Sequence, residues 1–354
     1  MFRPHILQMS GYVPGEQPRD QQFVKLNTNE NPYPCSPRVK AAVGRAITEG
    51  LQRYPDPLAT SFRELAAEVH RAELPQITPD WILCGNGSDD LLTMLTRCFV
   101  GPGQGVRFPR PSYVLYATLA ALQEAFLDVV DFDAAWRLGE RFAEPDPRVR
   151  LALLPNPNSP SGTMMAPAEV AAVADALPCP LVVDEAYVDF ADANCLPLVG
   201  RNERVIVTRS MSKSYGLAGL RFGYAVAQPQ VIEQMIKVKD SYNCDALSIA
   251  GATAALGDRE WFAANRAAVL ASRARLDEEL ARLGFAGCPS QANFLWRRHA
   301  EQPSAALYSG LKELGVLVRY MNYGDWGDGL RITVGSDPQI DVLLDRLRRL
   351  VPSR

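Results

Sequence analysis

Lys213 lies in a segment whose residue types are suited to covalent chemistry. It belongs to the run RSMSKSYG, in which Ser210 and Ser212 precede it, and Arg221 follows eight residues later. A lysine amine that is kept partly unprotonated can attack a carbonyl carbon. Serine hydroxyls and a guanidinium could bind a phosphate ester through charge-assisted hydrogen bonds. Taken alone, a solvated surface lysine in a glycine-rich loop is the better explanation of this segment, so other residues must decide.

Asp184 follows the apolar run Leu181 to Val183 directly. A carboxylate placed immediately after a buried strand is costly unless it meets a cation or several hydrogen-bond donors. Asp184 is therefore a candidate partner for a positively charged group, with a helix cap as the simpler alternative.

The segment Gly85-Asn86-Gly87-Ser88-Asp89-Asp90 also follows an apolar run, and its glycines permit a tight turn into a helix whose free N–H groups could bind a phosphate.

A third polar loop, PNPNSPSG, follows the apolar run Leu151 to Leu154 and presents Asn158 and Ser159. By itself it is a turn-rich loop without a chemical role. The positions of all four polar segments together favour a chemical role, because each lies at the end of a predicted strand. The four are GNGSDD, PNPNSPSG, the segment at Asp184 and the segment around Lys213. In a parallel sheet these ends lie together at one edge, where ligands bind.

Short apolar runs bounded by turn residues recur along the chain and predict the elements that carry these segments. Trp81 to Cys84, Leu151 to Leu154, Leu181 to Val183 and Val205 to Thr208 are continuous rather than alternating runs, which indicates strands buried on both faces. Helical spacing separates them, for example at Leu91, Met94, Leu95, Cys98 and Phe99. The fold class is therefore α/β, with a doubly wound, mostly parallel sheet.

The ends of the chain differ in character from this centre. The first forty residues are rich in Pro and Asn and predict an extended arm. After about residue 245 a long helix from Glu260 to Leu283, shorter strands (Asn293 to Trp296, Val316 to Arg319 and Leu330 to Val334) and a helix from Asp341 to Leu350 predict a smaller α+β domain.

Composition excludes several other classes of protein. The chain has 354 residues, 37 basic and 40 acidic, so its formal charge of −3 disfavours nucleic acid as a partner. Its three histidines and seven scattered cysteines form no metal-binding spacing, so we expect no metal, and unpaired cysteines favour a cytoplasmic location. No run is long enough to cross a membrane, and the N-terminus lacks the pattern of a signal peptide.

The chain resembles the pyridoxal-phosphate-dependent fold-type I aminotransferases, and within them the histidinol-phosphate aminotransferase group. The resemblance runs nearly end to end, through LNTNENP, RYPD, GNGSDD, PSYVLY, PNPNSPSG, VVDEAYVDF, RSMSKSYGLAGLRFGY, QANFLW and GLRITVG. It implies pyridoxal 5'-phosphate as the cofactor. It also implies an N-terminal arm over residues 1–45, a large cofactor-binding domain over 46–245 and a small domain over 246–354.

The resemblance assigns roles to individual residues. Lys213 would hold the cofactor and shuttle a proton, Asp184 would pair with the pyridine nitrogen, and Tyr187 would donate to the phenolic oxygen. Tyr113 would stack on the ring, and either Asn158 or Ser159 would contact the phenolic oxygen. A homodimer is implied, because Tyr54 matches a tyrosine that reaches the phosphate from the neighbouring subunit. The remaining phosphate contacts would come from Gly87, Ser88, Asp89, Ser210, Ser212 and Arg221.

For the substrate, Arg319 and Arg331 match arginines that face a phosphate, while Tyr12 and Asn29 match arm residues that close over the site. The expected reaction transfers the amino group between L-histidinol phosphate and 2-oxoglutarate, with glutamate as the other product, in histidine biosynthesis. Decarboxylation of threonine phosphate and transamination of aromatic amino acids stay open within the same fold. A ligand sensor without catalysis and a nucleotide-binding dehydrogenase are alternatives from other classes. Ligand sensors of this kind usually carry a DNA-binding domain ahead of the aminotransferase-like body, where this sequence has only a short arm. A dehydrogenase would need all three glycines of G-x-G-x-x-G, and GNGSDD lacks the third.

Overall fold

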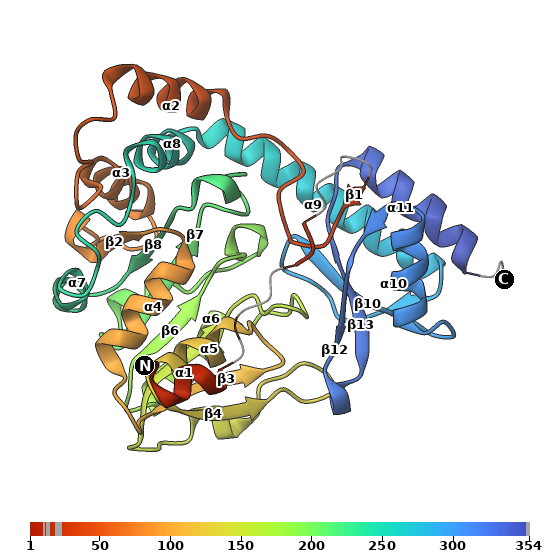
Figure 1. Cartoon of the computed structure of the whole chain (residues 1–354), viewed down its shortest axis with the longest axis horizontal. Helices are drawn as coiled ribbons and strands as arrows, with labels where there is room; N and C mark the ends of the chain where they lie inside the picture. The colour runs from red at the N-terminus through yellow and green to blue at the C-terminus, as the bar shows by residue number, and fades with distance from the viewer. Residues whose placement is uncertain (10, 12–14, 18–22, 352–354) are drawn as a thin grey trace.

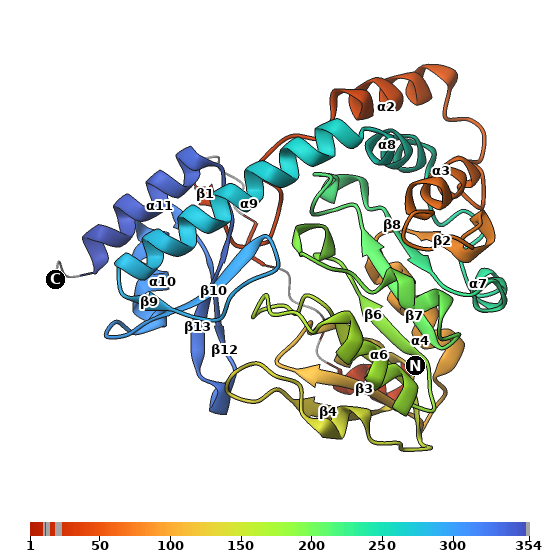
Figure 2. The same ribbon diagram turned by 180° about the vertical axis from the view of Figure 1, so that it is seen from behind.

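The computed structural model describes residues 1–9, 11, 15–17 and 23–351. It contains a seven-stranded and a four-stranded β-sheet, both covered by helices, and a two-stranded pair. Helix α9 (Arg259–Arg282) runs from the seven-stranded sheet to the four-stranded sheet along the back of the molecule (Figures 1 and 2). Within the described residues, no helix is both long and apolar enough to cross a membrane.

The larger sheet has seven strands, six of them parallel. In spatial order they are β2 (Ile82–Gly85), β8 (Gly223–Val226), β7 (Val205–Ser210), β6 (Leu181–Asp184), β5 (Val149–Pro155), β3 (Gly105–Arg110) and β4 (Phe126–Asp131). Strand β8 is antiparallel to both of its neighbours. The predicted α/β fold with a doubly wound, mostly parallel sheet is confirmed.

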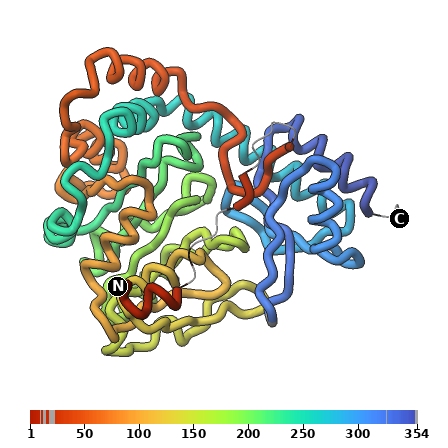
Figure 3. The backbone as a smooth tube through the Cα atoms, in the orientation of Figure 1, coloured from red at the N-terminus to blue at the C-terminus, as the bar shows by residue number. Residues whose placement is uncertain are grey.

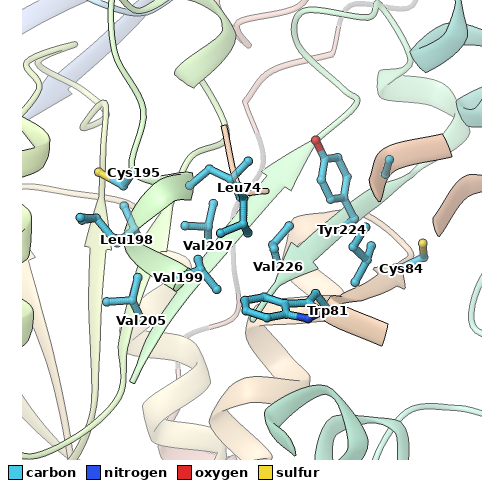
Figure 4. Packing of buried hydrophobic residues seen from close by; sticks show 14 of the residues in the cluster. Leu74, Trp81, Cys84, Cys195, Leu198, Val199, Val205, Val207, Tyr224 and Val226 are labelled. Atoms are coloured by element: carbon cyan, nitrogen blue, oxygen red, sulfur yellow. The ribbon is translucent and has the colours of Figure 1, made fainter. Parts of the chain in front are cut away.

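Both faces of this sheet are buried. Leu181 and Val183 belong to one hydrophobic cluster and Val182 to the other, because successive side chains of a strand point to opposite faces. Figure 4 shows Val205, Val207 and Val226 packed in the first cluster. That cluster receives side chains from α2 (Pro37–Glu49), α3 (Thr60–His70), α6 (Pro167–Ala176) and α8 (Ala246–Gly257). The second receives side chains from α4 (Ser88–Phe99), α5 (Leu115–Leu122) and α7 (Pro229–Ile236).

The smaller sheet has four antiparallel strands. In spatial order they are β12 (Arg319–Asn322), β13 (Asp328–Thr333), β10 (Phe294–His299) and β9 (Phe285–Ala286). Helix α9, α10 (Ser304–Glu313) and α11 (Asp337–Leu350) supply its apolar cover, with Leu276, Leu307 and Leu343 among the buried residues. This matches the expectation of a smaller α+β part.

One expected strand is divided. The run Val316 to Arg319 was expected to form a single element, but Val316 and Leu317 form β11, which pairs in parallel with β1 (Val24–Lys25) of the N-terminal arm. Arg319 begins β12 in the four-stranded sheet. The arm thus contributes a strand of its own, in addition to the short helix α1 (Pro4–Gln8), where an extended segment was expected. The expected end of the arm at residue 45 falls inside α2.

The arm follows the four-stranded part of the molecule before it turns toward α2 (Figure 3). Its residues from Leu26 to Asn31 therefore lie between the two sheets. Short 3-10 helices complete the described secondary structure: η1 (Pro79–Trp81), η2 (Glu140–Ala143), η3 (Val188–Phe190), η4 (Leu196–Gly200), η5 (Ala218–Leu220) and η6 (Gly324–Trp326).

Candidate active site

A cavity of about 250 Å³ opens at the carboxyl ends of β5, β6 and β7, where the arm and the four-stranded sheet face the larger sheet. Most residues predicted for the site line it together, although they come from segments up to three hundred residues apart. The predicted residues among its lining are Asn29, Ser88, Asp89, Tyr113, Ser159, Asp184, Tyr187, Ser210, Ser212, Lys213, Arg221, Arg319 and Arg331.

One end of the cavity is built to receive an anion. Gly87, with a φ of +86°, turns the chain into α4, so the free N–H groups of that helix's first turn begin at Ser88. A Cβ on Gly87 would lie 2.6 Å from the Arg221 guanidinium, which rests against this turn. Arg221 Nη1 donates to Ser212 Oγ over 3.3 Å, and its Nη2 lies 3.7 Å from Asp89 Oδ2. The N-terminus of α4, the Arg221 guanidinium and the hydroxyls of Ser210 and Ser212 line this end, which we name the phosphate cradle because such groups could hold a phosphate.

Asp184 lies below this cradle as a buried carboxylate. Its Oδ2 accepts a hydrogen bond from Tyr116 Oη at 2.8 Å, and its Oδ1 accepts from the backbone N–H of Ala186 at 3.2 Å. Burial raises the pKa of Asp184 to about 6, against the lowering effect of these hydrogen bonds. A cationic neighbour would stabilise a buried carboxylate with a raised pKa. Among the described residues, no side chain forms an ion pair with Asp184.

Lys213 projects into the same cavity from the loop that follows β7. Its Nζ donates to the carbonyl oxygen of Thr28 at 3.4 Å and lies 5.7 Å from the centre of the Tyr187 ring. The backbone carbonyl oxygen of Lys213 accepts a hydrogen bond from the Asn31 side chain at 3.0 Å. The arm therefore contacts both the amine and the main chain of this lysine.

Tyr187 and Asn29 connect the arm to the larger sheet. Asn29 Nδ2 donates to Tyr187 Oη at 3.0 Å, and the buried Asn29 is itself held by Thr333 and by the side chain of Asn293. The Tyr187 ring packs edge-on against Phe294, with ring centres 5.0 Å apart. These contacts hold the Tyr187 hydroxyl at the cavity wall.

Two arginines form a second anion-binding end, opposite the first. Arg319 on β12 and Arg331 on β13 are direct cross-strand partners, so their side chains share one face of the small sheet. Arg331 Nη1 donates to Ser159 Oγ at 2.9 Å, and its Nη2 donates to the carbonyl oxygen of Asn27 at 3.1 Å. Two neighbouring guanidiniums favour an anion between them and the larger sheet.

The structure leaves four predicted residues away from the cavity lining or undescribed. Tyr54 is 80% exposed and stacks on Tyr242, with ring centres 4.4 Å apart. Asn158 is buried beside the cavity, where its Nδ2 donates to Ser161 and to the carbonyl oxygen of Pro111, so Ser159 is the member of this pair that lines the cavity. Gly87 contributes backbone only. Tyr12 lies outside the described residues.

Sequence reasoning missed Tyr116 and Asn31. Tyr116 is fully buried, and burial and the neighbouring Asp184 raise its pKa, so it serves as a hydrogen-bond donor to that carboxylate. It lies in the run PSYVLY, three residues after Tyr113, and the two rings meet edge-on with their centres 5.7 Å apart. Asn31 lies in the quoted run LNTNENP, but only the fold brings it beside Lys213. Across the described chain, no group of three His, Cys, Asp or Glu side chains could hold a metal ion.

Comparisons with known proteins agree with this geometry. The family model for aminotransferase class I and II matches residues 21–347. A histidinol-phosphate aminotransferase of Rhodopirellula baltica is 53% identical over 99% of this chain and 96% of its own length, and histidinol-phosphate aminotransferase 1 of a Nostoc species is 41% identical over 100% and 99%. The crystal structure of histidinol-phosphate aminotransferase from Sinorhizobium meliloti in complex with pyridoxal-5'-phosphate matches with a TM-score of 0.86 at 26% identity, over 99% of this chain and 98% of that one. The chain belongs to the class I and II aminotransferase family.

Proposed function

We propose that this chain is a pyridoxal-phosphate-dependent aminotransferase that moves the amino group between L-histidinol phosphate and 2-oxoglutarate, as a step of histidine biosynthesis. The observation that carries the substrate is the pair Arg319 and Arg331, which lines the same cavity as Lys213. A substrate that carries an amine and, several bonds away, a phosphate can place the amine at Lys213 and the phosphate at the arginines. The names of the relatives support the same substrate.

The cavity also fits the cofactor. A pyridoxal phosphate molecule carries a phosphate, an aldehyde and a basic ring nitrogen at three different edges, and the cavity offers a suitable group to each. The N-terminus of α4 with Arg221 fits the phosphate, Lys213 fits the aldehyde, and the buried Asp184 fits a protonated ring nitrogen. The ionised form of Asp184 thereby gains the cationic neighbour that its burial calls for.

When bound, the cofactor supplies an electron-withdrawing ring that weakens a bond at the substrate's α-carbon. Asp184 holds a proton on the ring nitrogen and so maintains the positive charge there. Tyr187 Oη, fixed by Asn29, donates to the phenolic oxygen and orients the ring. Tyr113, which donates to Asp89 Oδ1 at 3.1 Å, offers its aromatic face to the ring.

Lys213 has two tasks in this proposal. Its Nζ would hold the aldehyde of the cofactor, and as a free amine it would accept and return the proton of the substrate carbon that bears the amino group. Thr28 and Asn31 contact the amine and the backbone of Lys213 and restrict its position. Arg319 and Arg331 orient the distal phosphate so that the α-carbon faces Nζ.

We also propose a homodimer in which Tyr54 reaches the cofactor phosphate of the neighbouring subunit. Tyr54 and Tyr242 form an exposed aromatic stack, and Ile47 and Leu51, shortly before Tyr54 in the sequence, are also exposed. Exposed apolar side chains of this kind are typical of an interface. Tyr54 does not line the cavity of its own chain, which supports a role in the partner's cavity. As part of the same proposal we place the protein in the cytoplasm, where its seven unpaired cysteines are stable.

Half-reaction spectra test the proposed substrate. The yellow holoenzyme is mixed in turn with histidinol phosphate, threonine phosphate and phenylalanine, and the visible absorbance of the bound cofactor is followed. We expect histidinol phosphate to bleach the band and 2-oxoglutarate to restore it. Bleaching by phenylalanine alone would favour an aromatic aminotransferase, and carbon dioxide release from threonine phosphate would favour the decarboxylase. No bleaching by any donor, with the cofactor bound, would favour a sensor.

A further inference from the structure

A row of three side chains crosses the small sheet and extends beyond the arginine pair. Arg331 is the cross-strand partner of Arg319 on one side and of Trp296 on the other. Directly paired residues of antiparallel strands project from the same face, so Arg319, Arg331 and Trp296 lie side by side. Trp296 is 4% exposed and is the buried member of this row. Its indole therefore adjoins the side chain that the proposed function assigns to the substrate phosphate.

The indole of Trp296 leans across Gly329, the residue two positions before Arg331. A Cβ on Gly329 would lie 2.5 Å from Cζ2 of Trp296, so only glycine leaves room for the ring in this place. Tyr323, between β12 and β13, packs against the same indole with ring centres 6.0 Å apart. Burial raises the pKa of Tyr323 to about 12, with Arg331 and Arg319 close enough to oppose the rise. Trp296 thus packs beside Arg331, with Gly329 and Tyr323 against its indole.

Trp136 reaches this packing from the larger sheet. It lies in the loop after β4, and its ring centre is 6.3 Å from that of Trp296 and 4.9 Å from that of Trp326 in η6. Trp296 and Trp326 belong to the small sheet and its hairpin turn, so Trp136 is a contact between the two sheets. We name Trp136, Trp296, Trp326 and Tyr323 the aromatic bridge.

The loop that carries Trp136 is built to hold it in place. Asp133 accepts hydrogen bonds from the backbone N–H groups of Ala135 and Arg137, and Phe132 pairs with Leu138 across the loop. Trp136 has a φ of +61°, a left-handed conformation that is strained for a bulky side chain. Such a conformation persists only where the surrounding contacts determine it, which here are the loop's own hydrogen bonds and the aromatic bridge.

We propose that Trp136 is a positioning residue for substrate specificity, which fixes Trp296 and the β12–β13 hairpin so that Arg319 and Arg331 hold the substrate's distal phosphate at the correct distance from Lys213. This inference rests on the proposed function, because it assumes that the two arginines bind that phosphate. Trp136 has no contact with the cofactor-binding end of the cavity among the described interactions. Its effect should therefore fall on substrate binding and leave cofactor binding unchanged.

The test compares Trp136→Ala and Trp136→Phe with the wild-type holoenzyme. We expect Trp136→Ala to raise the KM for histidinol phosphate at least tenfold while kcat changes less than threefold and the absorbance of the bound cofactor is unchanged. Trp136→Phe, which keeps an aromatic ring in the bridge, should recover most of the affinity. Glu140→Ala, an exposed change on the same connection, is the matched control and should leave both constants unchanged.

Hydrogen exchange gives a second readout that does not depend on the substrate. The hairpin from Arg319 to Thr333 should exchange faster in Trp136→Ala, whereas the cofactor-binding turn from Gly85 to Asp90 should not. A KM within twofold of wild type together with unchanged exchange in the hairpin would overturn the proposal. An equal increase of the KM for histidinol phosphate in Trp136→Ala and Trp136→Phe would overturn the proposal too. If wild type rejects histidinol phosphate, the proposed function fails, and the hairpin exchange alone decides whether Trp136 holds the hairpin.

Discussion

At the scale of single residues, the site contains a buried carboxylate, Asp184, with which no side chain of the described residues forms an ion pair. Asp184 is fully buried, its hydrogen bonds come from neutral groups, and its pKa is raised to about 6. Neighbouring Glu185 shows the contrasting solution: it points to the opposite side of the strand end, where Arg209 pairs with it at 2.9 Å. Of these two successive carboxylates, Glu185 forms an ion pair with Arg209, whereas Asp184 forms none with a described side chain.

This difference predicts the pH dependence of the cofactor-free protein. The pKa of Asp184 is higher in the folded chain than the ordinary value of 3.8, so ionisation of Asp184 destabilises the folded state. The cost is absent below about pH 4, grows up to about pH 6 and is complete above it, where it amounts to about 3 kcal/mol. Asp184→Asn is therefore expected to raise the free energy of unfolding of the cofactor-free protein at about pH 8 and to change it little at about pH 4.

Urea unfolding of cofactor-free wild type and variant at both pH values measures this effect. Glu185→Gln is the matched control, because it leaves the buried Arg209 without its ion partner and should destabilise the protein at about pH 8. A lower stability of Asp184→Asn than wild type at about pH 8 would contradict the prediction. Asp184→Asn should also bind pyridoxal phosphate less tightly than wild type, because the neutral amide of Asn cannot balance the positive charge on the protonated ring nitrogen.

At the scale of elements, the phosphate cradle depends on how closely β8 approaches the start of α4. Gly223, the first residue of β8, faces Gly87 and Ser88 so closely that a Cβ would lie 2.7 Å from the Ser88 nitrogen and 2.8 Å from the Arg209 carbonyl oxygen. Both neighbours are backbone atoms, which cannot move without shifting the turn. The strand next to the cradle therefore has to begin with glycine.

Gly223→Ala is expected to weaken binding of pyridoxal phosphate at least tenfold and to lower the free energy of unfolding by about 1 to 3 kcal/mol, as overpacking generally does. Gly219→Ala is its control, because a Cβ there would meet no atom within 4 Å. Cofactor titration followed by absorbance, together with urea unfolding, measures both effects. Equal affinity of Gly223→Ala and Gly219→Ala for pyridoxal phosphate would show that the close approach of Gly223 to Ser88 does not affect cofactor binding.

The elements also show how far the sequence can predict this structure. Continuous apolar runs predicted β5, β6 and β7, because strands buried on both faces need apolar side chains at every position. The sequence analysis did not identify β8, since Gly223 follows a loop with chemical motifs and its strand is only four residues long. It joined β11 to β12, because no turn residue separates Leu317 from Arg319 and only pairing with the arm distinguishes the two strands.

The candidate site was predictable to the extent that its residues lie at strand ends or in motifs. Asp184 ends β6, and Ser88 and Lys213 follow β2 and β7 closely, so topology alone places them at one edge. Tyr116 and Asn31 were missed because their importance comes from tertiary contacts with Asp184 and with the Lys213 backbone. Such contacts join segments that sequence spacing does not relate.

At the scale of the whole molecule, the proposed homodimer makes each cavity dependent on two chains. Lys213→Ala removes the amine and should abolish transamination, while Tyr54→Ala should impair it by weakening the hold on the cofactor phosphate. If Tyr54 acts across the interface, a heterodimer of the two variants contains one cavity with both native residues and one with neither. Co-expressed chains with different tags, purified as heterodimers, are then expected to recover about half of the wild-type activity per dimer.

The control for this recovery is each variant purified alone, in which neither homodimer contains an intact cavity. Light scattering establishes that the purified species are dimers. Activity in the heterodimer no higher than in the two homodimers would mean that Tyr54 serves its own chain. A monomer that retains full activity would exclude the shared cavity altogether.

The pairing of β1 with β11 also bears on the order in which the molecule is made. The seven strands of the large sheet are complete once residue 226 has left the ribosome, yet Asn29 finds its partner Thr333 only 304 residues after its own synthesis. Until then β1 has no strand to join, and Asn29 lacks its hydrogen bonds with Asn293 and Thr333. A nascent chain therefore contains Lys213 about a hundred residues before it contains β11 and Thr333, the partners that hold the arm over the cavity.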